Sequence, residues 1–89
     1  MSKTVHRRVE KIIDGDTFKV YRSVNGSRYI RIAGINTPEK WQYGYSSAKQ
    51  KLSGIIGGKV VTIEPVGRSY GRTVAHVSRY GNITRRMKK

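Results

Sequence analysis

The stretch TFKVYRSVNGSRYIRIAG, residues 17–34, decides the class of fold. Its first part alternates in the manner of a half-buried β-strand, with Phe18 and Val20 on one face and Thr17, Lys19 and Tyr21 on the other. Asn25-Gly26 then indicates a hairpin turn, because both positions tolerate a positive φ. The returning strand, residues 28–34, alternates again and places Ile30 and Ile32 on one face. The stretch therefore predicts a β-hairpin with one buried face.

The flanking segments extend this hairpin into a barrel. Residues 5–13, 59–65 and 72–80 are rich in β-branched residues and predict three more strands. A helix is predicted over 46–56 from apolar residues at helical spacing: Ala48, Leu52, Ile55 and Ile56. Ser46 or Ser47 would cap its start and Gly57-Gly58 its end. We therefore expect a mainly β (α+β) fold, a small five-stranded OB-fold barrel with one α-helix between the third and fourth strands.

Length and charge limit the classes of function. Residues 1–89 predict a single domain with a flexible basic tail at about 84–89. No segment could span a membrane and there is no cysteine, so we expect a cytoplasmic protein. We expect the protein to be either a monomer or a weak dimer. The 19 Lys and Arg against five Asp and Glu give a net charge of +14, which favours a polyanion as partner. Nucleic acid is the first candidate; an anionic membrane surface and simple solubility are the alternatives.

Three of the five acids fall in two short motifs. Asp14 and Asp16 belong to IDGDT at 13–17, and Glu39 closes GINTPE at 34–39. Carboxylates gathered at a bend between strands could hold a hard cation such as Ca²⁺, which prefers oxygen ligands. An ordinary Asp-Gly turn is the better explanation of IDGDT when the motif is taken alone. Arg31 and the YGR motif at 70–72 favour the metal site over the ordinary turn, because guanidiniums beside a metal ion suit a phosphodiester substrate.

The motifs IDGDT, R-x-x-GINTPE at 31–39 and YGR, in this order and spacing, resemble those of the staphylococcal nuclease (thermonuclease-like) family. The resemblance covers the chain from about Val9 to Ile83. It implies an OB-fold barrel that cleaves DNA and RNA without sequence preference and depends on Ca²⁺. Later helices of that family have no counterpart within these 89 residues.

The resemblance implies a role for each matched residue on the metal side. Asp16 corresponds to a carboxylate that binds the metal directly, and Thr37 to a ligand through its backbone carbonyl. Asp14 corresponds to an acid close to the metal that does not bind it directly. Asn36 stands where the family has Asp. Its amide oxygen can still bind Ca²⁺, but one negative charge is lost, so we expect weak binding, with a Kd of ~10⁻⁴–10⁻³ M.

On the substrate side, the resemblance makes Arg31 and Arg72 the two arginines that hold the scissile phosphate and stabilise its developing charge. Glu39 corresponds to the glutamate that orients or deprotonates the attacking water, and Tyr70 to a tyrosine beside the nucleotide. A bidentate guanidinium fits phosphate geometry, and a carboxylate one water away from phosphorus is a plausible base.

Two other classes of protein stay open. The first is a non-catalytic OB module that binds nucleic acid, as known among the repeated domains of Tudor-staphylococcal-nuclease proteins; Asn36 and the lack of later helices favour it. The second is a basic structural protein. Aromatic residues after GINTPE could stack on bases or pack the loop against the barrel: Trp41, Tyr43 and Tyr45. His76 has no second histidine at ligand spacing and predicts a strand or surface role.

Overall fold

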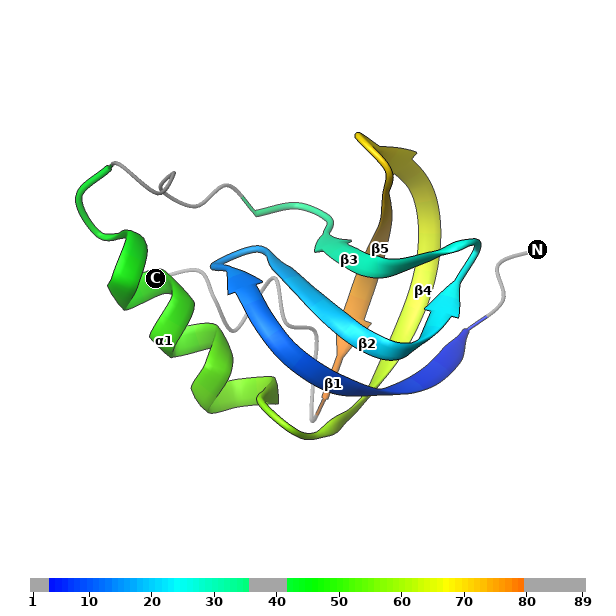
Figure 1. The fold of residues 1–89 in the computed structure, drawn as a ribbon, viewed down its shortest axis with the longest axis horizontal. Coiled ribbons are helices and arrows are strands. Elements are labelled where there is room, and N and C mark those ends of the chain that lie inside the picture. Colours follow the sequence, from blue (N-terminus) through cyan, green and yellow to red (C-terminus); the bar gives the residue numbers. More distant parts are fainter. Residues whose placement is uncertain (1–3, 36–41, 80–89) are drawn as a thin grey trace.

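The computed structural model describes residues 4–35 and 42–79. These residues form five strands and one helix in the predicted order (Figure 1). The elements are β1 (Val5–Asp14), β2 (Thr17–Val24), β3 (Ser27–Ile32), α1 (Tyr45–Ile56), β4 (Val60–Ser69) and β5 (Arg72–Ser78). The predicted basic tail at 84–89 lies outside the described residues. No helix in the described ranges is long and apolar enough to cross a membrane.

The strands close into a barrel in the order β1-β2-β3-β5-β4. Neighbours pair antiparallel except β3 and β5, which run parallel. Closure gives every strand two neighbours, so no strand edge stays open. The helix follows β3 and lies beside one end of the barrel (Figure 1). The predicted mainly β, five-stranded OB-fold barrel with one helix between the third and fourth strands is confirmed.

Three strand pairs are joined by two-residue turns, and in two of these turns both residues have positive φ. Asn25 and Gly26 connect β2 to β3 with φ values of 50° and 85°, as predicted for a turn in which both residues are left-handed. Tyr70 and Gly71 connect β4 to β5 in the same way, with φ values of 50° and 78°. Tyrosine is uncommon in this region of φ, so the sequence did not predict the second turn.

Strand β4 runs past the point where the sequence predicted its end. The predicted strand over 59–65 ends at Pro65, and proline has no N–H group to donate to the sheet. The register instead shifts between Pro65, which pairs with Ala75, and Gly67, which pairs with Val74. This β-bulge accommodates the proline and lets β4 continue to Ser69.

The helix begins earlier than predicted. Its N-cap is Gly44, with φ 89°, and no side chain caps it, so the predicted caps Ser46 and Ser47 are wrong. The predicted end at Gly57 is confirmed. A Cβ atom at Gly57 would lie 2.5 Å from the carbonyl oxygen of Ser53, which explains why glycine stands there.

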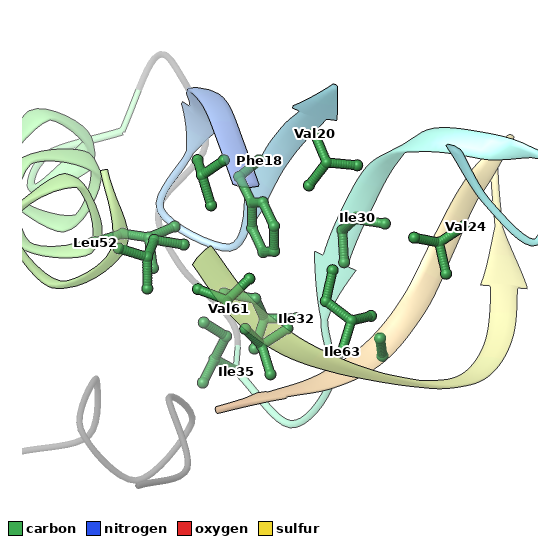
Figure 2. Packing of buried hydrophobic residues seen from close by; sticks show 13 residues of the cluster. Phe18, Val20, Val24, Ile30, Ile32, Ile35, Leu52, Val61 and Ile63 are labelled. Atoms are coloured by element: carbon green, nitrogen blue, oxygen red, sulfur yellow. The ribbon is translucent and has the colours of Figure 1, made fainter. Parts of the chain in front are cut away.

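The hydrophobic core fills the barrel and extends to the helix. Figure 2 shows Leu52, from α1, at one end of the cluster and Val24, from β2, at the other. The predicted inward residues are all buried, among them Phe18, Val20 and Ile30. The full cluster comprises Val9, Phe18, Val20, Val24, Ile30, Ile32, Ile35, Leu52, Ile56, Val61, Ile63, Ala75 and Val77.

Candidate functional site

Polar side chains from three strands meet around the turn that joins β1 to β2. Asp16 lies in this turn, Thr17 begins β2, Arg31 lies in β3 and Arg72 begins β5. Thr17 pairs with Arg31 across the β2–β3 ladder, and the backbone N–H of Ile32 donates to the carbonyl of Asp16 at 2.8 Å. The turn is therefore attached to β3. We call Asp16, Thr17, Arg31 and Arg72 the Asp16 cluster.

The hydroxyl of Thr17 connects the members of the Asp16 cluster. It donates to Oδ1 of Asp16 at 3.0 Å and accepts from Nη1 of Arg72 at 3.2 Å. Nη2 of Arg31 lies 3.5 Å from Oδ2 of Asp16 and 3.5 Å from the carbonyl oxygen of Ile35. One carboxylate thus receives the hydroxyl on one oxygen and faces a guanidinium on the other.

The charges of the Asp16 cluster favour an anion. Two guanidiniums and one carboxylate leave a local charge of +1, and the Asp16 and Arg31 side chains are 14% and 25% exposed. The ion pair is long for a hydrogen bond, and the described contacts of Arg72, to Thr17 and to the carbonyl of Ser69, use two of its five N–H donors. A phosphate could therefore bind both guanidiniums through donors that remain available.

Thr17 is the member of the Asp16 cluster that was not among the predicted site residues. The alternation placed it on the outer face with Lys19 and Tyr21, but its side chain is buried, with 1% of the residue exposed. Thr17 lies at the end of the barrel beside the β1–β2 turn, where its hydroxyl finds partners on both sides. Its place directly after Asp16 in IDGDT was the available signal.

Asp14 points to the helix. Oδ1 of Asp14 lies 2.9 Å from the hydroxyl of Tyr45, which also lies 3.1 Å from the carbonyl oxygen of Ile13. The hydrogen bond to Asp14, with burial and the charge of Asp14 as smaller causes, raises the pKa of Tyr45 above its ordinary value. Tyr45 therefore anchors the first turn of α1 to the end of β1.

The other aromatic residues and the histidine singled out in the sequence differ in their exposure to solvent. Tyr70 is 96% exposed at the β4–β5 turn, two residues before Arg72. Tyr43 is fully exposed before α1, whereas Tyr45 packs against β1 as described. His76 lies exposed in β5, as the predicted strand or surface role requires.

Several predicted site residues lie outside the described ranges: Asn36, Thr37, Glu39 and Trp41. The described chain stops at Ile35, directly before this segment. Ile35 is buried, and its carbonyl faces Arg31 of the Asp16 cluster. The GINTPE motif is thus attached to the cluster at its second residue.

Of the residues predicted to bind calcium, Asp16 lies within the described ranges. No group of three or more His, Cys, Asp or Glu that could hold a metal ion occurs within 4–35 and 42–79. Asp16 offers carboxylate oxygens, the kind of donor that Ca²⁺ prefers, and the sequence carries further oxygen donors at Asn36 and Thr37. The donor chemistry at Asp16 therefore fits calcium.

Comparison with known proteins gives a consistent class of relatives. No family model matches the chain. The sequence is 40% identical over 75 residues to an uncharacterized endonuclease of Escherichia coli O157:H7 and to one of Escherichia coli. These 75 residues are 82% of this chain and 48% of each relative. An uncharacterized endonuclease of Haemophilus influenzae is 39% identical over 71 residues, which are 79% of this chain and 40% of that protein.

The chain therefore spans about half the length, or less, of the curated relatives it matches. The described residues themselves form a closed barrel with two arginines and an aspartate gathered at one turn. Over most of its own length, this chain is similar to bacterial proteins named as endonucleases.

Proposed function

We propose that this chain carries the cleavage site of a calcium-dependent nuclease of the staphylococcal type, which hydrolyses phosphodiester bonds of DNA, RNA or both. The observation that carries the proposal is the Asp16 cluster, in which residues far apart in the sequence bring two guanidiniums and a carboxylate together. The similarity to proteins named endonucleases supports the same class of reaction. The net charge of +14 suits a polyanionic substrate.

In this proposal Arg31 and Arg72 bind the scissile phosphate. Each guanidinium offers N–H donors in a planar fork that matches two phosphate oxygens. As water attacks, negative charge grows on these oxygens, and donors already in place stabilise the transition state more than the ground state. Thr17 fixes Arg72, and Asp16 faces Arg31, so both guanidiniums are positioned before substrate arrives.

Glu39 is the proposed base. Its carboxylate takes a proton from the attacking water while the water oxygen forms a bond to phosphorus. The bond from phosphorus to one sugar oxygen breaks, and this oxygen leaves with the bonding electrons and takes a proton from solvent. Asp16, Asn36 and Thr37 would hold the calcium ion, with Asp14 close by. A bound calcium ion supplies positive charge near the phosphate oxygens.

A second candidate function is a nucleic-acid-binding module that does not cleave. Asn36 favours it, because an amide in place of a carboxylate lowers the negative charge available to a metal. Asp16 favours the enzyme, since a carboxylate that faces Arg31 and is linked through Thr17 to Arg72 weakens simple phosphate binding.

The test is digestion of a labelled single-stranded DNA and a labelled RNA with millimolar calcium, with and without excess chelator. Cleavage that the chelator abolishes is expected. Arg72→Ala should lose most of this activity, whereas Arg68→Ala is the matched control. Arg68 is an exposed arginine in the same β4–β5 hairpin, and it bonds to the carbonyl of Asn25 outside the cluster.

Two results would count against the proposal. A folded sample that binds the oligonucleotides but shows no chelator-sensitive cleavage supports the binding module instead. If Arg72→Ala and Arg68→Ala lost equal cleavage activity, arginine charge alone, rather than the Asp16 cluster, would determine the activity.

A further inference from the structure

An exposed face on β1, β2 and β3 combines aromatic rings with positive charge. Phe18, Val20 and Ile30 point into the core, so the residues between them point outward. Tyr21 is 57% exposed and Tyr29 is 41% exposed. We call the surface formed by Lys11, Lys19, Tyr21 and Tyr29 the Tyr29 face.

The sheet register arranges this face in a row. Lys11 of β1 pairs directly with Lys19 of β2, and Lys19 pairs directly with Tyr29 of β3. Like charges at directly opposed positions destabilise a sheet, and neither lysine has an acidic partner among the described residues. Glu10, the neighbour of Lys11, is instead paired with Arg28. The Tyr29 face therefore presents unneutralised cations that an anion would stabilise.

The row continues toward the Asp16 cluster. Strands β3 and β5 run parallel with Ile30 opposite Thr73, so Tyr29 and Arg72 each directly precede a residue of this pair. The Ser27 hydroxyl donates to the carbonyl of Gly71 at 2.9 Å and holds this part of β3 against the β4–β5 turn. Three strand spacings separate β1 from β5, so the row spans roughly 14 Å.

We propose that the Tyr29 face binds an unpaired stretch of nucleic acid, with a base stacked on Tyr29 and neighbouring phosphates at Lys11 and Lys19. The strand then reaches Arg72 and Arg31 without leaving the surface of the barrel. Stacking on an aromatic ring requires a base that is not paired, which selects a single strand over a duplex. The inference rests on the part of the proposed function that makes nucleic acid the partner, and it does not require cleavage.

The contact that Tyr29 makes in the free protein is compatible with this role. Nζ of Lys19 lies over the ring, 5.5 Å from its centroid. An exposed cation–π contact is worth about a 2- to 5-fold change in an equilibrium, whereas stacking of one base is worth about 5- to 150-fold. A base therefore outcompetes the ammonium, and the flexible lysine can move to a phosphate. Before binding, the same contact holds the ring in place.

The experiment measures binding by fluorescence anisotropy in excess chelator, so that no cleavage occurs. The probes are a single-stranded oligonucleotide, an abasic oligonucleotide of equal length and a duplex of the same sequence. Tyr29→Ala should weaken binding of the single strand by about 5- to 150-fold and leave the other two probes unchanged. Tyr29→Phe, which keeps the ring, should bind like the parent. Val66→Ala removes exposed apolar surface from β4 and is the control.

Lys19→Ala tests the phosphate contact separately. It should weaken the single strand and the abasic probe alike, and it should reduce the slope of log affinity against log salt by about 0.7. In the unaltered protein, an oligonucleotide that carries 5-bromouracil should cross-link within residues 17–31. This measurement does not depend on whether any variant folds.

The proposal is overturned if Tyr29→Ala binds the single strand like the parent, or loses equal affinity for all three probes. A cross-link found only outside residues 17–31 would also overturn it. The outcome is separable from the proposed function, because a protein without chelator-sensitive cleavage can still show these binding results. Conversely, a protein that cleaves can still bind equally with Tyr29→Ala.

Discussion

Replacing Thr17 tests whether the Asp16 cluster works as a unit. Thr17→Val keeps the branched shape of a buried residue but removes the hydroxyl, whose two hydrogen bonds reach Asp16 at 3.0 Å and Arg72 at 3.2 Å. Thr17→Ser is the matched control, since it keeps the hydroxyl and loses only a methyl group. The two variants separate the connection between charged groups from the packing around it.

The size of the effect follows from these two bonds. A hydrogen bond to a charged group contributes about 1.5–3 kcal/mol, and a partner that is partly exposed recovers some of this from water. The side chain of Asp16 is 14% exposed, so we expect Thr17→Val to lower the free energy of unfolding by about 1–3 kcal/mol in total. Each kcal/mol corresponds to roughly 4–8 °C in Tm for a domain of this size.

The effect on cleavage has a different origin. Without the hydroxyl, Arg72 is free to shift relative to Asp16, and a misplacement of about 1 Å can cost ~10²-fold in rate. We expect kcat/KM to fall about 10- to 100-fold in Thr17→Val and less than about threefold in Thr17→Ser, measured on a labelled single strand at saturating calcium. If Thr17→Val cleaves like the parent while its Tm falls, the hydroxyl stabilises the barrel without positioning Arg72.

Three further predictions concern other parts of the site. Glu39→Gln should slow cleavage by about 10²–10⁴-fold and leave oligonucleotide binding intact, whereas Arg31→Ala should weaken both; rates that match the parent in Glu39→Gln would exclude this residue as the base. Asn36→Asp should lower the calcium concentration for half-maximal cleavage, and an unchanged midpoint would mean that Asn36 is not a ligand. Tyr45→Phe should melt below the parent at neutral pH. The difference in Tm between the parent and the variant should be complete below pH 10.0, the ordinary pKa of tyrosine. It should shrink as the pH rises through the raised pKa of Tyr45, because only the protonated hydroxyl donates to Asp14. A difference in Tm that does not change with pH would contradict this prediction.

The sequence predicted the barrel well because its signals were local. Alternating residues around Phe18 and Ile30 gave the faces of β2 and β3, and Asn25-Gly26 gave the turn between them. The details that it missed depend on neighbours that a local pattern does not contain. Pro65 stays inside β4 because the bulge accommodates it, and Gly44 starts α1 where a serine cap was expected.

The site was harder to predict from the sequence than the barrel, because its geometry depends on contacts between residues of different strands. The alternation placed Thr17 outside, although it lies buried between two charged partners. Tyr45 could have stacked on bases or packed on the barrel, and only the position of α1 against β1 decides for packing. The motifs predicted Asp16 and Arg31 as members of one site, and the structure places Nη2 of Arg31 3.5 Å from Oδ2 of Asp16. Glu39 lies outside the described residues, so its role stays a prediction.

Formation of the Asp16 cluster and closure of the barrel are one physical event. Arg72 reaches Thr17 across 55 positions of sequence, and it can do so only when β5 pairs with β3. A buried hydrogen bond also holds β5 in this position: the Thr73 hydroxyl donates to the carbonyl of Val24, the last residue of β2, at 2.7 Å. A barrel that opened at β5 would therefore lose the second guanidinium while Asp16 and Arg31 stayed paired through β2 and β3. The same closure pairs β3, which carries Tyr29, with β5, which begins at Arg72, so the proposed binding surface and the proposed cleavage site both depend on one pair of strands.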